Sequence, residues 1–538
     1  MVSVFYNCLV RTMDPVCPIA EAVTAENGVI TYVGTKEEAL SRAGETADRI
    51  DLHGAVMVPG LIDSHMHMLY TAFFRTKTDL SSCTSFSETM ALLQAKAEAM
   101  KDKPGAWLCA VGFNQDTWSD RKELPTRLEL DAAVGSVPCF ITRVCGHIAV
   151  YNTRALEILG IMSGEYDRTV SLFPDGTPDG RVYEADFQPG DRFLPAPGIE
   201  EYKKWIVEES LRCAAAGLTA VHSDDLNLVS PGKDAGTVME AYRELGLGGR
   251  LPIRVFEQCR IEEENAIRSF AAAYPAGTEF GRFRTVSVKQ MMDGSLGARS
   301  AFMRRHDGSD ADNGIAIHSD EEINGLVLTA NSCGYPVVAH CIGDGAVEQL
   351  LNAFSSAKAA LGDSGLRNGV VHCQIMGTDQ LERMAENDVL AYVQPVFVRA
   401  DSAIVEKIVG RDIALQSYNW RKMLELGIHV SCGTDSPVES NDPIANIYYA
   451  VTRTGSDGKP WIPENGMTAE EALRAYTIEG AYAAGMEDKL GSISVGKYAD
   501  FTVLDRDIIR VAPEEIKNIS VIMTVVGGEQ VYLRRETV

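Results

Sequence analysis

The sequence lacks the features that mark a secreted or membrane-inserted chain. Its first residues, MVSVFYNCLVRTMDP, do not have the basic start, long apolar core and small-residue cleavage site of a signal peptide. No apolar run approaches the roughly 20 residues that span a bilayer. The 12 cysteines are scattered and contain no Cys-x-x-Cys pair, which is typical of reduced thiols rather than of a disulfide framework. We therefore expect a cytoplasmic protein with no membrane partner.

Positive charge is also scarce. The chain has 50 Lys and Arg against 75 Asp and Glu, a formal net charge of −25. Nucleic acids and anionic membranes are bound by basic patches, so this balance argues against both partners. The remaining composition, 45% hydrophobic and 23% charged, is ordinary for a globular protein. A length of 538 residues exceeds one simple core and predicts two or more domains.

The two ends of the chain have the same character. Residues 1–58 and 489–538 consist of short alternating strands separated by turns. Asn27-Gly28 and Gly527-Gly528 are strong hairpin signals. Two β-rich ends around a different middle predict one small β-sandwich domain that both termini build together.

Residues 59–488 alternate apolar strand-like runs with longer helical stretches, the pattern of α/β folds. Eight strand candidates occur, the count of a TIM-type (β/α)8 barrel: LIDSHMH, LTAVHSDD, PIRVFEQ, TVSVKQMMDG, YPVVAHCIGD, GVVHCQ, LAYVQPVF and HVSCGTDSP. An interval of about residues 70–215 separates the first two candidates. It contains its own strand, PCFITRVCGH, and we expect it to be an insertion after the first barrel strand.

Polar side chains with metal-binding chemistry stand at the carboxyl ends of these strands. They are His65 and His67 on the first strand, Lys289 on the fourth, His340 on the fifth, His372 on the sixth and Asp435 on the eighth. The two histidines of the first strand are two positions apart, so both rings point to one side. In a barrel these strand ends converge on one face, where active sites are built. A core histidine or a turn aspartate would explain any one of them, but the set together predicts a metal site.

Imidazole and carboxylate ligands without clustered thiolates suit Zn²⁺, or Mn²⁺, Fe²⁺ or Co²⁺. Zinc lowers the pKa of a bound water to about 7, so that hydroxide can attack a carbonyl at neutral pH. Asp435 is the expected catalytic base, which would take the proton of this water and pass it to a leaving nitrogen. We therefore expect a small-molecule substrate.

Several segments together resemble the amidohydrolase superfamily of metal-dependent hydrolases: VPGLIDSHMH, HCIGDGAV, VHCQ, GTDSPVESNDP and GSISVGKYADFTVLD. LPTRLELDAAVGSVPCFITRVCGHIAVYNTRAL and VKQMMDGSLGARSA are similar to segments of its branch that contains the YtcJ-like proteins and N-substituted formamide deformylase. The similarity extends from about Asp51 to Asp505. It implies a barrel with a composite β-sandwich, in agreement with the pattern of strands above.

The resemblance also implies metal ligands, with His65, His67 and Asp435 on a more buried metal and His340 and His372 on a second one. Lys289 stands where family members often carry a lysine whose CO2-derived carbamate bridges two metals. The alternative is an unmodified lysine, neutral or paired with Asp293, beside a single metal. Val371 replaces the glutamate that usually precedes the sixth-strand histidine in the branch, which puts a polar contact there in doubt.

Four further residues are candidates for substrate contact. His147 matches a position that the branch uses near the substrate, and His222 ends the second strand. Trp118 would line an aromatic wall, and Asp293 opens DGSLG, a tight turn near the mouth of the barrel. For each of them a structural hydrogen bond, a core position or a plain turn is the alternative.

The function expected from these features is metal-dependent hydrolysis of a C–N bond in an amide, N-acyl, N-formyl or cyclic amide substrate. A deaminase of heterocycles is the first alternative, but such enzymes usually carry glutamate three residues after the fifth-strand histidine, and here His340 is followed by Cys-Ile-Gly-Asp. A catalytically silent binding or regulatory homologue is the second alternative, although it would be expected to lose ligands. We expect a homodimer.

Overall fold

The chain divides into two compact units. Unit 1 contains Met1–Leu69, Ile199–Leu228 and Gly236–Val538, and unit 2 contains Tyr70–Gly198 and Val229–Ala235. The computed structural model describes residues 2–102, 105–143, 148–163, 170–183, 194, 196–230, 232–304 and 313–535. His147, which we expected near the substrate, lies outside these described residues.

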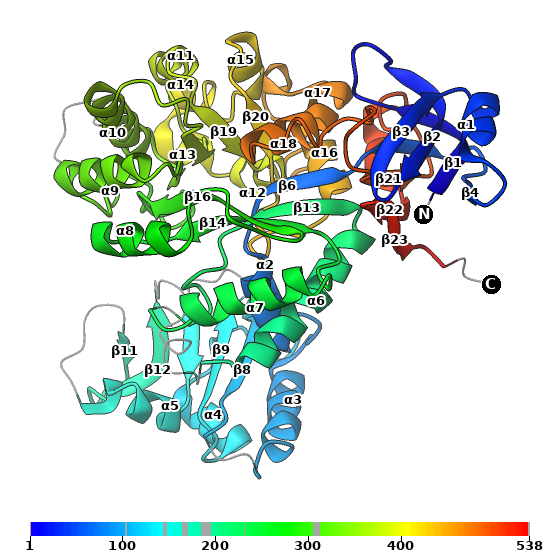
Figure 1. The fold of residues 1–538 in the computed structure, drawn as a ribbon. Helices are drawn as coiled ribbons and strands as arrows, with labels where there is room; N and C mark the ends of the chain where they lie inside the picture. Colours follow the sequence, from blue (N-terminus) through cyan, green and yellow to red (C-terminus); the bar gives the residue numbers. More distant parts are fainter. Residues whose placement is uncertain are drawn as a thin grey trace. The chain divides into compact units, whose positions relative to one another are not determined.

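Eight parallel strands form a barrel in unit 1 (Figure 1). Along the sheet they are β20 (Val430–Cys432), β19 (Leu390–Val393), β18 (Gly369–His372), β17 (Val337–Cys341), β16 (Phe283–Met291), β14 (Arg254–Arg260), β13 (Leu218–Ser223) and β6 (Leu61–Met66), and β15 (Glu279–Phe280) adds an antiparallel edge to β16. At the seam, the Ser64 hydroxyl of β6 donates a hydrogen bond to the Cys432 carbonyl of β20 at 2.6 Å. The expected (β/α)8 fold is confirmed.

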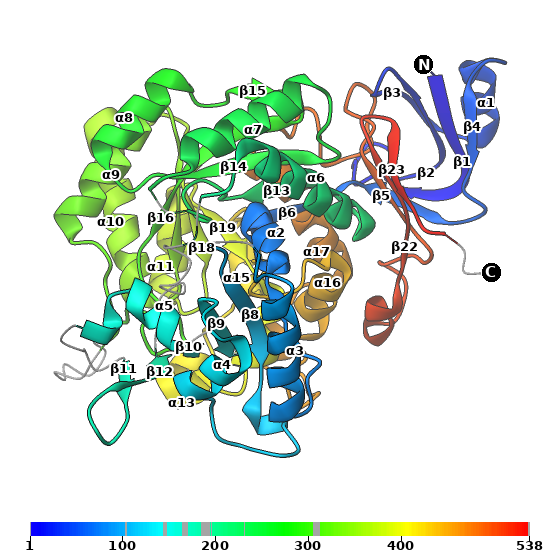
Figure 2. The ribbon, with the colours of Figure 1, turned by 90° about the horizontal axis from the view of Figure 1, so that it is seen from below.

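Helices follow these strands along the chain, and most of them pack on the outside of the barrel (Figure 2). They include α6 (Ile199–Ala215), α7 (Ala235–Leu247), α8 (Glu264–Ala273), α9 (Asp320–Ser332), α10 (Asp344–Leu361), α11 (Thr378–Glu386), α12 (Val398–Asp401), α13 (Val405–Val409), α14 (Arg411–Ala414), α15 (Trp420–Glu425), α16 (Pro443–Thr452), α17 (Ala469–Ala475) and α18 (Ile478–Ala483). Ser319 and Glu322 form a capping box that starts α9, and Ile323, Leu326, Val327 and Ala330 bury one face of it. Residues 199–215, which we expected in the insertion, thus form α6 of unit 1.

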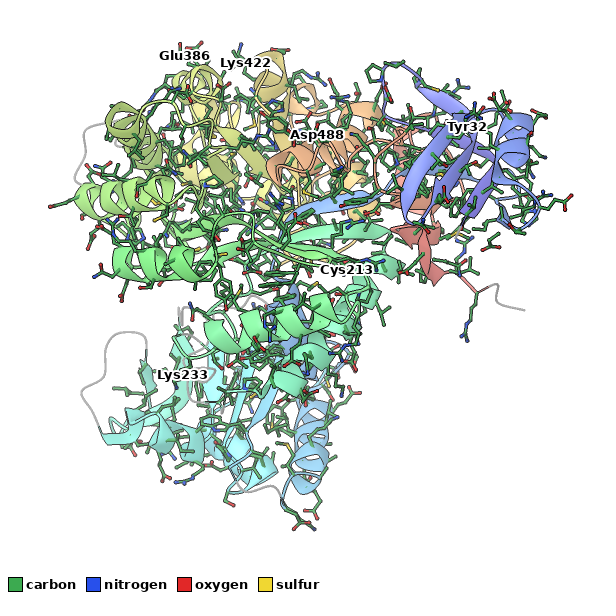
Figure 3. All side chains as sticks on the ribbon, viewed as in Figure 1. Tyr32, Cys213, Lys233, Glu386, Lys422 and Asp488 are labelled. Carbon is green, nitrogen blue, oxygen red and sulfur yellow. The ribbon has the colours of Figure 1, made fainter. Side chains whose placement is uncertain are left out.

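The outer helices carry charged side chains such as Glu386 on α11 and Lys422 on α15 (Figure 3). Within the part of the chain that the structure describes, no helix combines the length and the apolar character needed to cross a bilayer.

The two ends of the chain meet in a second sheet of unit 1. Its strands run in the order β23 (Glu529–Leu533), β22 (Val521–Val526), β21 (Phe501–Leu504), β5 (Val56–Pro59), β1 (Val2–Arg11), β2 (Ile19–Glu26) and β3 (Val29–Gly34), with β4 (Asp48–Asp51) beside β1 and α1 (Lys36–Ala43) after β3. Phe501 pairs with Pro59 where the two ends join. Phe5, Met57, Phe501 and Val525 share one buried cluster, so both termini build one β domain, as expected.

Unit 2 has a sheet of its own, in the order β11 (Val170–Leu172), β12 (Pro178–Tyr183), β10 (Ile148–Tyr151), β9 (Cys139–Arg143), β8 (Leu108–Phe113) and β7 (Thr78–Asp79). Its helices are α3 (Phe86–Glu98), α4 (Arg127–Val134) and α5 (Thr153–Ile158), and α2 (Met68–Thr76) leads into it from unit 1. The predicted strand PCFITRVCGH contains β9.

Trp118 belongs to the core of unit 2. Its side chain is fully buried, stacks on Phe113 with 5.8 Å between ring centroids, and meets the edge of Phe86 at 5.7 Å. The expectation that Trp118 lines a pocket wall is therefore corrected, because an indole enclosed by apolar side chains has no surface left for a substrate.

Candidate metal centre

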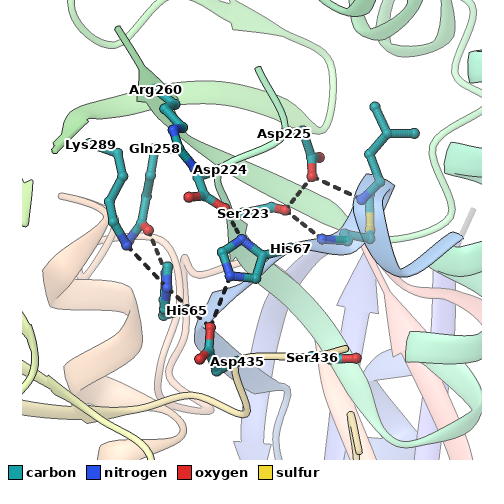
Figure 4. Close-up of polar contacts among 12 residues, drawn as sticks. His65, His67, Ser223, Asp224, Asp225, Gln258, Arg260, Lys289, Asp435 and Ser436 are labelled. Carbon is teal, nitrogen blue, oxygen red and sulfur yellow. Dashed lines mark hydrogen bonds and ion pairs between the residues drawn. The ribbon is translucent and has the colours of Figure 1, made fainter. Parts of the chain in front are cut away.

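The carboxyl ends of β6 and β20 bring three candidate ligands together (Figure 4). Nε2 of His67 lies 3.0 Å, and Nε2 of His65 lies 3.4 Å, from Oδ1 of Asp435. One ligand atom from each of the three residues lies within 4.8 Å of the other two. This spacing fits one cation bound by all three side chains.

Hydrogen bonds across the barrel seam fix this arrangement. Asp63 of β6 accepts hydrogen bonds from the backbone N–H and the hydroxyl of Thr434 at 3.1 and 2.6 Å. The N–H of Asp435 donates to the carbonyl of His65 at 2.9 Å. Asp435 has φ = +58°, a left-handed conformation that is uncommon outside glycine and often found at functional sites. The backbone after β20 thereby turns the carboxylate toward His65 and His67.

The other three expected ligands lie beside this group. Nζ of Lys289, on β16, is 3.1 Å from Nε2 of His65. The rings of His340 and His372, from β17 and β18, have centroids 4.5 Å apart, and the His372 ring lies 5.7 Å from that of His65. His372 has φ = +81°, so a second strand ends in left-handed backbone at this place. The six side chains form one connected cluster.

Two amide side chains fix the ring orientation of His65 and His372. Nδ1 of His65 lies 2.8 Å from Oε1 of Gln258, and Nδ1 of His372 lies 2.8 Å from Oε1 of Gln394. The amide nitrogen of each glutamine donates to a backbone carbonyl, which fixes its oxygen toward the histidine. Because an amide oxygen only accepts, each Nδ1 carries the hydrogen and each Nε2 keeps a lone pair that can bind a metal.

The remaining two histidines are held in the same way. The Asp224 carboxylate accepts a hydrogen bond from Nδ1 of His67, which leaves Nε2 for a metal. His340 uses the opposite nitrogen: its Nε2 donates to the carbonyl of Gly294 at 3.0 Å, so Nδ1 carries the lone pair. Every histidine of the cluster thus has one anchored ring nitrogen and one available ring nitrogen.

The electrostatic environment favours neutral imidazoles at three of these positions. Burial lowers the pKa of His65 and His372 well below the usual value, and that of His340 to about 3. Burial also lowers the pKa of Lys289. At His67, burial is outweighed by the Asp224 and Asp435 carboxylates, which raise its pKa to about 10. The two carboxylates therefore stabilise positive charge at the place where the three candidate ligands converge.

Asp224, Gln258 and Gln394 are the functional candidates that the sequence analysis missed. Asp224 directly follows β13, and the two glutamines lie at the ends of β14 and β19. The position of a polar residue at the end of an apolar strand would have identified them, as it identified the ligands. In the segment HSDD, His222 was selected from the sequence as the candidate instead of Asp224.

His222 does not face the mouth of the barrel, and that expectation is corrected. Its ring is fully buried, 5.2 Å from Phe256 and 6.3 Å from Tyr392 between centroids. β13 and β19 are not neighbours in the sheet, so both rings point into the barrel interior. Nε2 donates to the carbonyl of Gly480 in α18 at 3.0 Å. His222 is a hydrogen-bonded core histidine.

The carboxylate of Asp293 is buried and occupied by backbone N–H groups. The expectation that Asp293 contacts the substrate is therefore also corrected. Its buried carboxylate accepts hydrogen bonds from the N–H groups of Phe302, Ile342 and Gly343 at 3.0, 3.0 and 2.8 Å. Burial raises its pKa to about 7 despite these bonds. Among the described residues no ion pair joins it to Lys289. It holds the turn that follows His340.

Comparisons with known proteins identify the family to which the chain belongs. Residues 48–532 match the amidohydrolase family. The chain is 29% identical to the protein YtcJ of Bacillus subtilis, over 99% of each chain, and 27% identical to the N-substituted formamide deformylase of Arthrobacter pascens, over 98% of each. It superposes on an uncharacterized metal-dependent hydrolase from Pyrococcus horikoshii with a TM-score of 0.79 and 24% identity, covering 96% of this chain and 99% of the other. The chain therefore belongs to the amidohydrolase family.

Proposed function

We propose that this protein is a metal-dependent hydrolase that cleaves the C–N bond of a small amide, N-acyl, N-formyl or cyclic amide substrate. The observation that carries the proposal is the set of four histidines, each anchored through one ring nitrogen, with the other nitrogen directed into a single cluster with Asp435 and Lys289. The similarity to N-substituted formamide deformylase over nearly the full length of both chains supports the choice of bond.

The donor set fits a divalent metal, with zinc the preferred ion, because it combines imidazole nitrogens with a carboxylate. Nε2 of His65, Nε2 of His67 and the Asp435 carboxylate would hold one ion. Nδ1 of His340 and Nε2 of His372 would hold a second. Bound there, the metal would supply Lewis acidity, which acidifies water and polarises a carbonyl.

The protein's own contribution to the reaction is the movement of a proton by Asp435. The carboxylate orients the attacking water and accepts its proton as the water oxygen bonds to the carbonyl carbon. It then returns this proton to the nitrogen as the C–N bond breaks. The products are an amine and a carboxylic acid, which is formic acid for an N-formyl substrate, and no serine or cysteine nucleophile is required.

We further propose that Lys289 carries a carbamate. Burial lowers the pKa of its amine, and a neutral amine is the form that adds to CO2. The nitrogen of the neutral amine bonds to the CO2 carbon and loses one proton, which converts a neutral side chain into an anionic one. An ammonium 3.1 Å from Nε2 of His65 would repel a bound cation, whereas the two carbamate oxygens would serve as ligands.

Metal analysis combined with a substrate screen tests the proposal. Protein purified without chelator should contain zinc or a similar metal, and His65→Ala should lose both metal and activity. N-formyl amines, N-acyl amines, cyclic amides and amino-heterocycles form the panel. Hydrolysis of amides supports the proposal, and release of ammonia from heterocycles alone would instead identify a deaminase. Absence of metal after reconstitution with zinc would contradict both the hydrolase and the deaminase function and would favour a binding role.

A further inference from the structure

Arg260 is the last residue of β14 and lies beside the metal centre. In the parallel register it pairs with Lys289, whose Nζ contacts His65. Paired residues of neighbouring parallel strands point to the same side of the sheet, so both side chains face the centre. Figure 4 shows the guanidinium directed toward Asp224. Burial is the main cause of the low pKa values of Lys289 and His340, and the charge of Arg260 contributes to both.

The guanidinium of Arg260 forms hydrogen bonds through only one of its nitrogens among the described residues. Its Nε donates to Oε1 of Glu262 at 2.9 Å, and the Glu262 side chain is 53% exposed. Among the residues that the structure describes, its two terminal nitrogens have no hydrogen-bond partner. The Arg260 side chain is 19% exposed, so it remains accessible at the strand end. An arginine keeps its charge at every relevant pH and presents a planar fork of donors that matches a carboxylate.

Two other arginines near these strand ends, Arg304 and Arg399, are already engaged. Arg399 contacts both carboxylate oxygens of Glu439 at 3.2 and 3.0 Å. Arg304 binds Glu348 and Asp379. Asp224, toward which the guanidinium points in Figure 4, binds His67 through Oδ1, and no hydrogen bond or ion pair joins it to Arg260 among the described residues. Arg260 thus directs terminal donors toward the centre that have no hydrogen-bond partner among the described residues.

Taking the proposed C–N hydrolase function as its basis, we propose that Arg260 binds a carboxylate of the substrate. The preferred substrates are then amides that carry a carboxylate close to the scissile bond, rather than neutral amides. The chain as a whole is strongly acidic, with a formal net charge of −25, and disfavours anions at long range. Recognition of an anion consequently requires a local cation with free donors, and Arg260 meets this requirement.

A positioning role is the competing explanation. Arg260 could act only through Asp224, and so through the orientation of His67. In that case its removal would weaken metal binding and slow every substrate equally. Direct recognition instead affects only substrates that carry the carboxylate, and acts on KM more than on kcat. The two roles are therefore separable by paired substrates.

The test compares N-formyl and N-acetyl derivatives of glycine, leucine and phenylalanine with their methyl esters, on full-length, metal-loaded protein. The wild type should prefer the acids. Arg260→Met should lower kcat/KM for the acids about 10- to 100-fold, mostly through KM, and leave the esters within about twofold. Arg260→Lys should rescue part of the loss, because it restores the charge without the fork. Glu262→Gln should lower KM for the acids, because it removes the negative charge that competes with the substrate carboxylate for Arg260.

Arg243→Met is the matched control, since this α7 arginine is paired with Glu240 on the surface and its loss changes the net charge equally. It should leave the acid preference unchanged. An equal loss for acids and esters in Arg260→Met, or no preference in the wild type, would overturn the inference. Calorimetric binding of the same acids and esters distinguishes the two proposals. If the acids bind in an Arg260-dependent way but are not turned over, only the proposed hydrolase function is refuted. If the acids do not bind in an Arg260-dependent way, the role of Arg260 is refuted.

Discussion

The carboxylate of Asp224 accepts a hydrogen bond from Nδ1 of His67, and this bond leaves Nε2 of His67 facing Asp435 at 3.0 Å. A metal-binding histidine that donates its other N–H to a carboxylate is fixed in tautomer and orientation, and is a stronger ligand. The aspartate after the second barrel strand therefore supports a candidate ligand that belongs to the first.

Asp224→Asn should lower metal affinity by about 10- to 100-fold, the usual cost of losing such a supporting carboxylate. Activity at saturating metal should fall less than activity at limiting metal. Titration with zinc in a competing chelator measures the affinity. Asp225→Asn is the control, because Asp225 bonds to the Leu69 N–H, Ser223 and Tyr242 rather than to a ligand. Asp225→Asn should lower thermal stability but leave metal affinity close to that of the wild type. A larger loss of metal affinity in Asp225→Asn than in Asp224→Asn would contradict the role of Asp224.

Gln394→Leu should selectively weaken the second metal position. The substitution removes the acceptor at 2.8 Å that fixes the tautomer of His372, whereas Gln258, the partner of His65, remains. Metal content should fall from about two ions per chain toward about one. Gln258→Leu, the matched variant at the first position, should reduce total metal more severely. If the two variants lose metal equally, the division of ligands between two ions is wrong.

Lys289→Ala should likewise lower the metal content, and should abolish a carbamate signal in carbon-13 NMR of protein equilibrated with labelled CO2. Both effects follow if the carbamate oxygens are ligands. Lys77→Ala, at a buried lysine of unit 2, should keep the carbamate signal. Retention of the same metal content in Lys289→Ala, with no labelled signal in the wild type, would show an unmodified lysine beside one metal.

The barrel, and the strand ends at which the candidate ligands stand, were predictable from the sequence because both depend on local order along the chain. Each barrel strand is a short apolar run, and His65, His340 and His372 each stand at the end of one. The register that places Arg260 beside Lys289 depends on pairing between strands, which no local pattern contains. The hydrogen bonds that join His65 to Gln258 and His372 to Gln394 depend on this strand pairing as well.

The depth of a side chain within the barrel was the least predictable property. His222 and Asp224 are two residues apart on the same segment, and the rule that strand ends face the mouth applied only to Asp224. His222 instead packs on Phe256, because the barrel interior below the strand ends must be filled by side chains. Asp293 was misassigned for a related reason: its partners are backbone N–H groups from residues distant in sequence.

His222 should make the stability of the fold depend on pH. Burial lowers its pKa to about 4, whereas the unfolded chain takes up the proton near pH 6.5. The unfolded state binds more protons between these values, so falling pH favours unfolding, by about 3 kcal/mol in total. His222→Gln keeps a donor for Gly480 but does not titrate, and should lose this part of the slope in urea unfolding at pH 7, 6 and 5. His53→Gln, at an exposed histidine, should keep the wild-type slope. Equal slopes in all three proteins would mean that His222 is not held neutral.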